Sequence, residues 1–266
     1  MNKAYILLIV IAFSSCTPRA YYMSPFNTNC NTYHARPMLA DSVKSAIYAS
    51  ILFTGGTAND NGNDGVYNVQ VSLHGSHTTK YFQAYYGGNF AVGRYNVGHY
   101  SYNGNIDFLK QDEINSKAGA KFFGGGWLNG GINIVIPMKQ HEFRVLGIES
   151  SLGKEWGDYY SFRKGLSDSA ASTIFRDDRF GSIGLCTEMV FRARKSAVGM
   201  KFAYGESFYK NLNQERTVTK PFYLERGYYS TTFSITKEIL TVSMQLNAGV
   251  YATSAQLGFT WRLGQR

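Results

Sequence analysis

The stretch ILTVSMQLNAGVYATSAQLGFTWRLGQR, residues 239–266, alternates between apolar and polar side chains over two strand lengths. Apolar residues occupy the even positions from 240 to 250 and the odd positions from 257 to 263, while Thr, Ser, Gln, Asn, Gly and Arg fill the positions between them. Successive side chains of a β-strand point to opposite faces, so the pattern predicts two strands that each have one apolar face.

The same period of two recurs from residue 42 onward, and no stretch of comparable length has the 3.6-residue period of an amphipathic helix. Most of these segments are longer than the usual globular strand of about 5 to 6 residues and near the 9 to 11 that a tilted membrane strand needs. We predict about ten strands, within a range of eight to twelve, at 44–54, 65–75, 80–93, 121–136, 142–156, 180–193, 196–208, 226–236, 239–251 and 255–263.

The polar faces of these segments carry Asn, Gln, Ser, Thr and Gly with few Lys or Glu, unlike a surface in bulk water. Connections after the first, third, fifth and seventh segments are long, whereas those after the second, fourth, sixth and eighth are short. In hydrocarbon an unpaired backbone group costs several kcal/mol, so strands can span a membrane only if their sheet closes. The sequence therefore predicts an all-β, transmembrane, antiparallel up-and-down β-barrel.

Residues 42–266 resemble the outer-membrane β-barrel proteins of Gram-negative bacteria. The segment QLGFTWRL, residues 256–263, is similar to the aromatic-bearing C-terminal strand of that class. The resemblance implies localisation in the bacterial outer membrane, long loops outside the cell, and short turns with both chain termini in the periplasm. Aromatic residues near strand ends are expected to form two interfacial girdles, an outer one with Trp156, Tyr159, Tyr160, Tyr228 and Tyr229 and an inner one with Phe143, Phe191 and Trp261.

The N-terminal stretch MNKAYILLIVIAFSSC has a positive start, an apolar core and small residues before Cys16, which is typical of a secretory signal. It also resembles the bacterial lipobox, in which the cysteine is acylated. We therefore expect a signal peptide at 1–15, a lipid-anchored periplasmic segment at 16–41 and the barrel at 42–266. Cleavage by the ordinary signal peptidase is the alternative, and Cys30 and Cys186 are expected to be free thiols.

Residues 17–41 lack periodicity but are too rich in aromatic residues for an idle linker. We expect this segment either to tether Cys16 to the first strand or to enter the lumen as a plug, binding the periplasmic mouth of the barrel or another envelope protein. The formal charge of +9 favours contact with outer-membrane lipid and lipopolysaccharide. No zinc-finger or RNP-type motif accompanies the charge, so no nucleic-acid partner is predicted.

A two-residue turn at Arg194 and Lys195 sets the register of the sixth and seventh strands and places Glu188 opposite Lys201. We predict a lumen ion pair between them, which Glu149, Arg192 and Arg262 join. A ten-stranded barrel has a narrow lumen, so the pair is expected to be structural. A small-ion path or a buried catalytic pair is the alternative.

The histidines give no clear active site. His74, His77 and His141 flank turns on the predicted periplasmic side and are expected to be solvated there, without metal-ligand spacing. His99 precedes acidic loops in a way similar to the Asp and His residues of ten-stranded outer-membrane proteases; the acidic residues are Asp107, Asp112, Glu113, Asp158, Asp168, Asp177 and Asp178. No cofactor motif is present. We predict a non-enzymatic barrel with a structural, accessory or binding role, the alternatives being a rim hydrolase acting on peptide or lipid and a narrow channel for small solutes.

Overall fold

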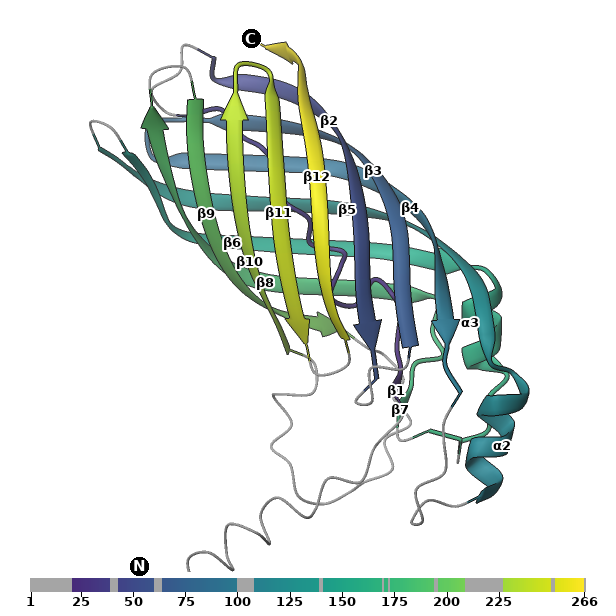
Figure 1. Ribbon diagram of the computed structural model, residues 1–266. Helices are drawn as coiled ribbons and strands as arrows, with labels where there is room; N and C mark the ends of the chain where they lie inside the picture. The colour runs from purple at the N-terminus through teal and green to yellow at the C-terminus, as the bar shows by residue number, and fades with distance from the viewer. Residues whose placement is uncertain are drawn as a thin grey trace, which may run out of the picture.

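The computed structural model describes residues 21–38, 43–59, 64–99, 108–138, 141–168, 170–171, 173–193, 196–208, 227–249 and 252–265 (Figure 1). Its helices are α2 (Phe108–Ser116) and α3 (Asp158–Lys164). The strands are β1 (Tyr21–Tyr22), β2 (Ser45–Ala58), β3 (Asp64–Thr78), β4 (Phe82–Val97), β5 (Gly119–Pro137), β6 (His141–Trp156), β7 (Thr173–Ile174), β8 (Arg179–Ala193), β9 (Ser196–Phe208), β10 (Gly227–Lys237), β11 (Leu240–Gly249) and β12 (Ala252–Gln265).

Ten of these strands form one closed barrel in the order β10-β11-β12-β2-β3-β4-β5-β6-β8-β9. Every neighbouring pair is antiparallel, and β12 closes the ring on β2, from Ala252 opposite Ala58 to Gln265 opposite Ala46. β9 and β10 also pair along their lengths. Closure leaves no free strand edge, which meets the requirement for backbone groups in hydrocarbon. The predicted antiparallel ten-stranded barrel is confirmed.

Several strands extend past the residues at which the sequence predicts an end. β2 continues to Ala58, because Gly55 and Gly56 pair in register with Tyr67 and Val66 of β3. Glycine is a turn signal in isolation, but here the neighbouring strand supplies hydrogen bonds that keep the residues extended. Tertiary pairing therefore overrides the local turn signal.

The buried face of each barrel strand is the polar one. In β3, Asn68 and Gln70 are at most 5% exposed, whereas Val69 and Val71 on the opposite face are at least 38% exposed. A soluble sheet that packs on a core shows the reverse. The polar residues line the interior of the barrel, as the alternating pattern predicts for a lumen.

The barrel has two different mouths (Figure 1). At the mouth named here the turn mouth, β3 joins β4, β5 joins β6, β8 joins β9 and β10 joins β11 through short connections. At the opposite mouth, the loop mouth, lie α2, α3 and the parallel pair β1 and β7. A small apolar core there includes Ile114, Tyr159 and Phe162. No helix among the described residues is long and apolar enough to cross a membrane.

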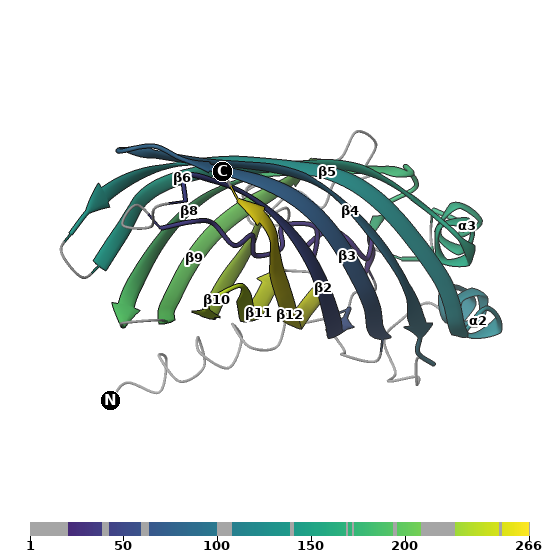
Figure 2. The ribbon, with the colours of Figure 1, turned by 90° about the horizontal axis from the view of Figure 1, so that it is seen from above.

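Residues 21–38, named the plug, run through the lumen from one mouth to the other (Figures 1 and 2). The Tyr21 backbone N–H donates to Asn59 Oδ1 at 2.6 Å at the loop mouth. At the turn mouth, the Thr78 hydroxyl donates to the carbonyl oxygen of Pro37 at 3.1 Å. Of the two arrangements predicted for the N-terminal segment, the described residues adopt the lumen plug.

The plug also separates the two ends of the described chain. Tyr21 lies at the loop mouth, whereas Gln265 pairs with Ala46 at the turn mouth. The expectation that both chain termini lie on the side of the short turns concerns residues outside the described ranges and stays a prediction. The path of the plug thus places Tyr21 and Gln265 at opposite mouths of the barrel.

Candidate functional site

Phe26 of the plug fills the lumen near the loop mouth. Its ring is fully buried and lies 5.4 Å from the ring of Phe123, 5.2 Å from that of Trp127 and 5.0 Å from that of Phe180. A Cβ atom on Gly125 would lie 2.4 Å from Phe26 Cε2. The glycine-rich run of β5 thus leaves the space that this ring needs.

The middle of the plug forms hydrogen bonds to the polar faces of β11 and β12. The Ser254 hydroxyl donates to Asn29 Oδ1 at 2.5 Å, and the Gln245 amide donates to the Asn31 carbonyl oxygen at 2.8 Å. All four residues are at most 8% exposed. These lumen-facing amides and hydroxyls therefore supply the partners that buried plug backbone and side chains require.

Toward the turn mouth, the plug enters a buried cluster of charges. Glu188 accepts hydrogen bonds from Arg36 Nη2, from Arg144 Nη1 at 2.7 Å and from the Tyr33 hydroxyl at 3.0 Å. Arg144 Nε also donates to Glu142 Oε1 at 2.9 Å. Arg36, Glu142, Arg144 and Glu188, named the lumen ion cluster, balance two positive charges with two negative ones. This pairing makes the burial of four charged groups tolerable.

The predicted register of Glu188 and Lys201 is confirmed, since the two residues are direct partners across β8 and β9. Their ion pairing differs from the prediction. Lys201 Nζ donates to Glu149 Oε2 at 2.5 Å, while Glu188 binds Arg36 and Arg144. Arg144 is the register partner of Glu188 on its other neighbour, β6, and Arg36 comes from the plug. The register of β8 and β9 alone cannot predict that Arg36 and Arg144 bind Glu188 in place of Lys201.

Arg144 and Glu142 face the lumen because β6 contains a β-bulge. The register with β8 shifts between Arg144 and Gly147, and Val145 and Leu146 both face outward. A bulge changes which parity of residues points inward. Strict alternation counted back from Glu149 therefore assigns Arg144 to the wrong face; two successive apolar residues are the only signal in the sequence.

The three histidines expected to be solvated near the turns do not lie together. His74 is 1% exposed, and its ring lies 5.0 Å from that of Tyr48 and 4.7 Å from that of His34 in the plug. His77 and His141 are exposed. The expectation of a solvated turn histidine is wrong for His74, because β3 continues past it and carries its side chain into the lumen.

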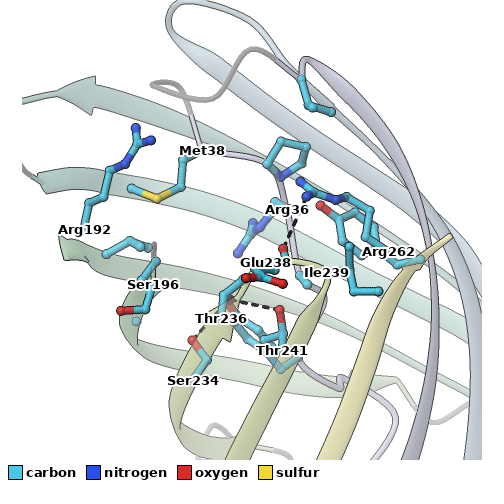
Figure 3. A pocket seen from close by; sticks show the side chains of 18 of the residues that line it. Arg36, Met38, Arg192, Ser196, Ser234, Thr236, Glu238, Ile239, Thr241 and Arg262 are labelled. Carbon is cyan, nitrogen blue, oxygen red and sulfur yellow. Dashed lines mark hydrogen bonds between the residues drawn. The ribbon is translucent and has the colours of Figure 1, made fainter. Parts of the chain in front are cut away.

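A pocket of about 420 Å³ opens at the turn mouth, between the end of the plug and the wall (Figure 3). Arg36 and Arg144 of the lumen ion cluster lie among its lining residues, and Arg192 and Arg262 line it as well. Figure 3 shows Arg192 and Arg262 on opposite sides of the pocket, and Arg262 Nη2 donates to the Glu238 carbonyl oxygen at 3.3 Å. The sequence predicted that Glu149, Arg192 and Arg262 join the pair of Glu188 and Lys201. Glu149 does bind Lys201, whereas Arg192 and Arg262 line the turn-mouth pocket.

The acidic residues of the loop mouth form hydrogen bonds and ion pairs of their own. Glu113 accepts from the Ser167 hydroxyl at 2.5 Å and from Lys117 Nζ at 2.9 Å, and the Ser167 contact is the main cause of its lowered pKa. The hydrogen bond from Lys154, at 2.9 Å, is the main cause of a lowered pKa at Asp178. These contacts hold the loops to one another.

No hydrogen bond joins His99 to a carboxylate among the described residues. His99 is exposed, and Asp168 instead pairs with Arg176 at 2.6 Å. Within the described ranges, no group of three or more His, Cys, Asp or Glu side chains could hold a metal ion. Among the described residues, His99 and these carboxylates therefore form no hydrogen-bonded constellation, and the rim hydrolase stays an alternative.

Some predictions fall outside the described residues. They concern the signal peptide at 1–15, the lipidation of Cys16, Asp107, and the turn at 194–195. Cys30 and Cys186 are described, and both are buried free thiols, as expected.

Large apolar side chains cover the outer wall of the barrel. Leu128 is 72% exposed, Leu152 70% and Ile235 58%, and further exposed apolar residues follow on every strand of the ring. Soluble proteins rarely expose continuous apolar patches beyond a few hundred Å². A closed sheet with this wall and a polar interior is stable only in hydrocarbon. The chain is a transmembrane β-barrel.

The predicted aromatic girdles hold in part. Trp156 is 40% exposed and Trp261 39% on the outer wall, near the two mouths of the barrel. Tyr228 and Tyr159 are at most 2% exposed, so their assignment to the outer girdle is wrong. Tyr228 faces the lumen, and Tyr159 stacks on Tyr95 at a centroid distance of 3.8 Å.

Solved structures of similar shape are outer-membrane barrels. An outer membrane channel from Pseudomonas putida F1 is 9% identical, with a TM-score of 0.42, and the alignment covers 84% of this chain and 97% of that one. The outer membrane protease OmpT from Escherichia coli is 9% identical, with a TM-score of 0.34 and coverage of 85% and 98%. The translocator domain of the autotransporter NalP from Neisseria meningitidis is 11% identical, with a TM-score of 0.40 and coverage of 85% and 90%. No family model and no curated protein sequence matches the chain.

Proposed function

We propose that this protein is a non-enzymatic, plugged outer-membrane barrel with a structural, accessory or binding role. Its apolar wall contacts outer-membrane lipid and lipopolysaccharide, and its long connections contact another envelope protein. The observation that carries the proposal is the plug, whose residues are nearly all buried against the lumen wall from one mouth to the other. A lumen filled in this way is suited to rigidity and binding rather than to transport.

The plug is the argument against the alternative of a small-solute channel. Phe26 packs against three aromatic rings, and Arg36 is held by Glu188 within the lumen ion cluster. Opening a path requires these contacts to break together. Planar-bilayer recordings of the purified full chain should therefore be electrically silent, and Phe26→Ala should produce brief openings. A steady conductance of the unaltered protein would support the channel instead.

The rim-hydrolase alternative depends on His99. Of the acidic residues that follow His99 in the sequence, Glu113 binds Ser167 and Lys117, and Asp168 binds Arg176. The His99→Ala substitution should leave every peptidase and lipid-hydrolase activity of whole cells unchanged. Loss of such an activity in this variant would contradict the non-enzymatic role and support the rim hydrolase.

We further propose that the loop mouth faces the outside of the cell and that Cys16 carries a lipid anchor. Cys16 is five residues before Tyr21, which lies at the loop mouth. Five extended residues span at most about 18 Å, whereas the apolar band of such a barrel is about 25 Å tall. A lipid on Cys16 then enters the outer leaflet, not the periplasmic one expected from the strand count.

Cysteine labelling of intact cells with a membrane-impermeant maleimide tests this topology. Lys164 at the loop mouth and Lys80 at the turn mouth are both exposed. We expect Lys164→Cys and Arg19→Cys to react and Lys80→Cys to react only after lysis. Reaction of Lys80→Cys in intact cells would reverse the orientation. Incorporation of a labelled fatty acid, lost in Cys16→Ala, tests the anchor separately.

A further inference from the structure

The turn-mouth pocket has the features of a binding site for a small anion. We propose that it binds a polyvalent oxyanion that carries phosphate or carboxylate groups. The proposal deepens the binding role proposed above by naming the class of ligand. It does not depend on which side of the membrane the turn mouth faces.

The lining of the pocket is rich in arginine. Among the described lining residues, four carry a guanidinium group and one, Glu238, carries a carboxylate; the four are Arg36, Arg144, Arg192 and Arg262. Glu142 and Glu188 neutralise the two inner arginines from behind. Arg192 and Arg262 at the rim add two further guanidinium groups to the lining. A guanidinium binds phosphate and carboxylate through two parallel hydrogen bonds, which selects oxyanions over chloride.

The floor of the pocket has donor capacity that the protein does not use. Arg36 donates to Glu188 through Nη2, but its Nε and Nη1 have no hydrogen-bond partner in the described part of the chain, although the side chain is only 2% exposed. A buried N–H group without a partner is costly. An anion or an anion-bound water at the floor would satisfy these donors.

Close packing behind the pocket requires a glycine at position 199. A Cβ atom on Gly199, which lines the pocket, would lie 2.5 Å from Ser234 Oγ and 3.4 Å from Glu188 Oε1. Glycine at this position therefore lets the Ser234 side chain pack closely against β9, beside the lumen ion cluster. The plug closes the lumen behind Arg36, so the pocket is blind. A ligand that enters from the turn mouth is held there and does not pass through the barrel.

The volume limits the ligand to a small molecule. About 420 Å³ lies at the small end of the pockets that hold small-molecule ligands. The lining includes the hydroxyl groups of Ser234, Thr236 and Thr241 besides the arginines, so neutral hydrogen-bonding parts of a ligand also find partners. We therefore choose inorganic pyrophosphate and citrate as probes, which separate the phosphate from the carboxylate form of the ligand.

Isothermal titration calorimetry of the detergent-solubilised full chain is the test, with each probe in turn at low salt. We expect saturable binding of at least one probe. The double substitution Arg192→Gln, Arg262→Gln should weaken it at least tenfold, because both rim charges are removed. Glu238→Gln should strengthen binding severalfold, since it removes the one carboxylate among the described lining residues.

The matched control removes two positive charges from the same mouth outside the pocket. Lys80→Gln, Lys237→Gln alters exposed residues that do not line the pocket and should change the affinity less than twofold. The proposal is overturned if neither probe binds saturably, or if the control weakens binding as much as the arginine pair. Because conductance is not measured here, a failure of this test is distinct from a failure of the plugged-barrel proposal.

Discussion

Replacing Glu188 by Gln should loosen the plug from the wall. The Glu188 side chain is fully buried and accepts hydrogen bonds from Arg36, from Arg144 at 2.7 Å and from Tyr33 at 3.0 Å. Glutamine keeps the shape but removes the negative charge, which leaves two buried guanidinium groups with Glu142 as the one remaining carboxylate of the cluster. Removing one partner of a buried ion pair costs about 3 to 5 kcal/mol. The retained amide oxygen places the expected loss at about 3 kcal/mol, more than a hundredfold in the unfolding equilibrium.

Urea unfolding in detergent, followed by tryptophan fluorescence, measures this loss. Glu238→Gln is the matched control, because it makes the same chemical change at an exposed position of the turn mouth and should alter the free energy of unfolding by less than about 0.5 kcal/mol.

The double substitution Glu188→Gln, Arg36→Gln tests whether the two residues act through one interaction. The double variant no longer leaves the Arg36 charge unpaired, so its loss should be smaller than the sum of the two single losses. If Glu188→Gln behaves like Glu238→Gln, the lumen ion cluster does not fasten the plug, and the argument for a tightly plugged lumen fails.

Two further predictions concern the plug and the loops. Gly125→Ala should destabilise the fold by about 1 to 3 kcal/mol in the same urea assay, because its Cβ would meet the Phe26 ring, whereas Gly88→Ala, whose Cβ has no neighbour nearer than 3.8 Å, should be close to neutral; equal effects would contradict the packing. Hydrogen bonding from Ser167 lowers the pKa of Glu113. The ionised Glu113 carboxylate therefore stabilises the fold fully at a pH above the ordinary carboxyl pKa, and this stabilisation is lost as the pH falls through the lowered pKa. A carbon-13 titration of Glu113 should give a midpoint below about 4.3 that rises in Ser167→Ala; an ordinary midpoint in the unaltered chain would refute the contact.

Much of the candidate site was beyond prediction from the sequence for identifiable reasons. The position of Glu188 opposite Lys201 could be predicted by counting residues on either side of one short turn, because the turn fixes the register of its two strands. The actual partner of Lys201, Glu149, lies on β6 and not on either strand next to β9. Arg144 was hidden by the bulge, which breaks alternation without leaving a distinctive residue type.

The sequence by itself determined the barrel, because each strand needs only its own period of two to separate a lipid face from a lumen face. That pattern is local, repeated ten times, and enforced wherever unpaired backbone would meet hydrocarbon. Only the tertiary structure decided that residues 21–38 occupy the lumen. The plug contacts strands on every side of the lumen, so its apolar and polar residues follow no periodic pattern that the sequence could reveal. The route of the plug brings Arg36 to Glu188 across 152 residues of sequence, and it creates both the closed interior and the arginine-lined pocket.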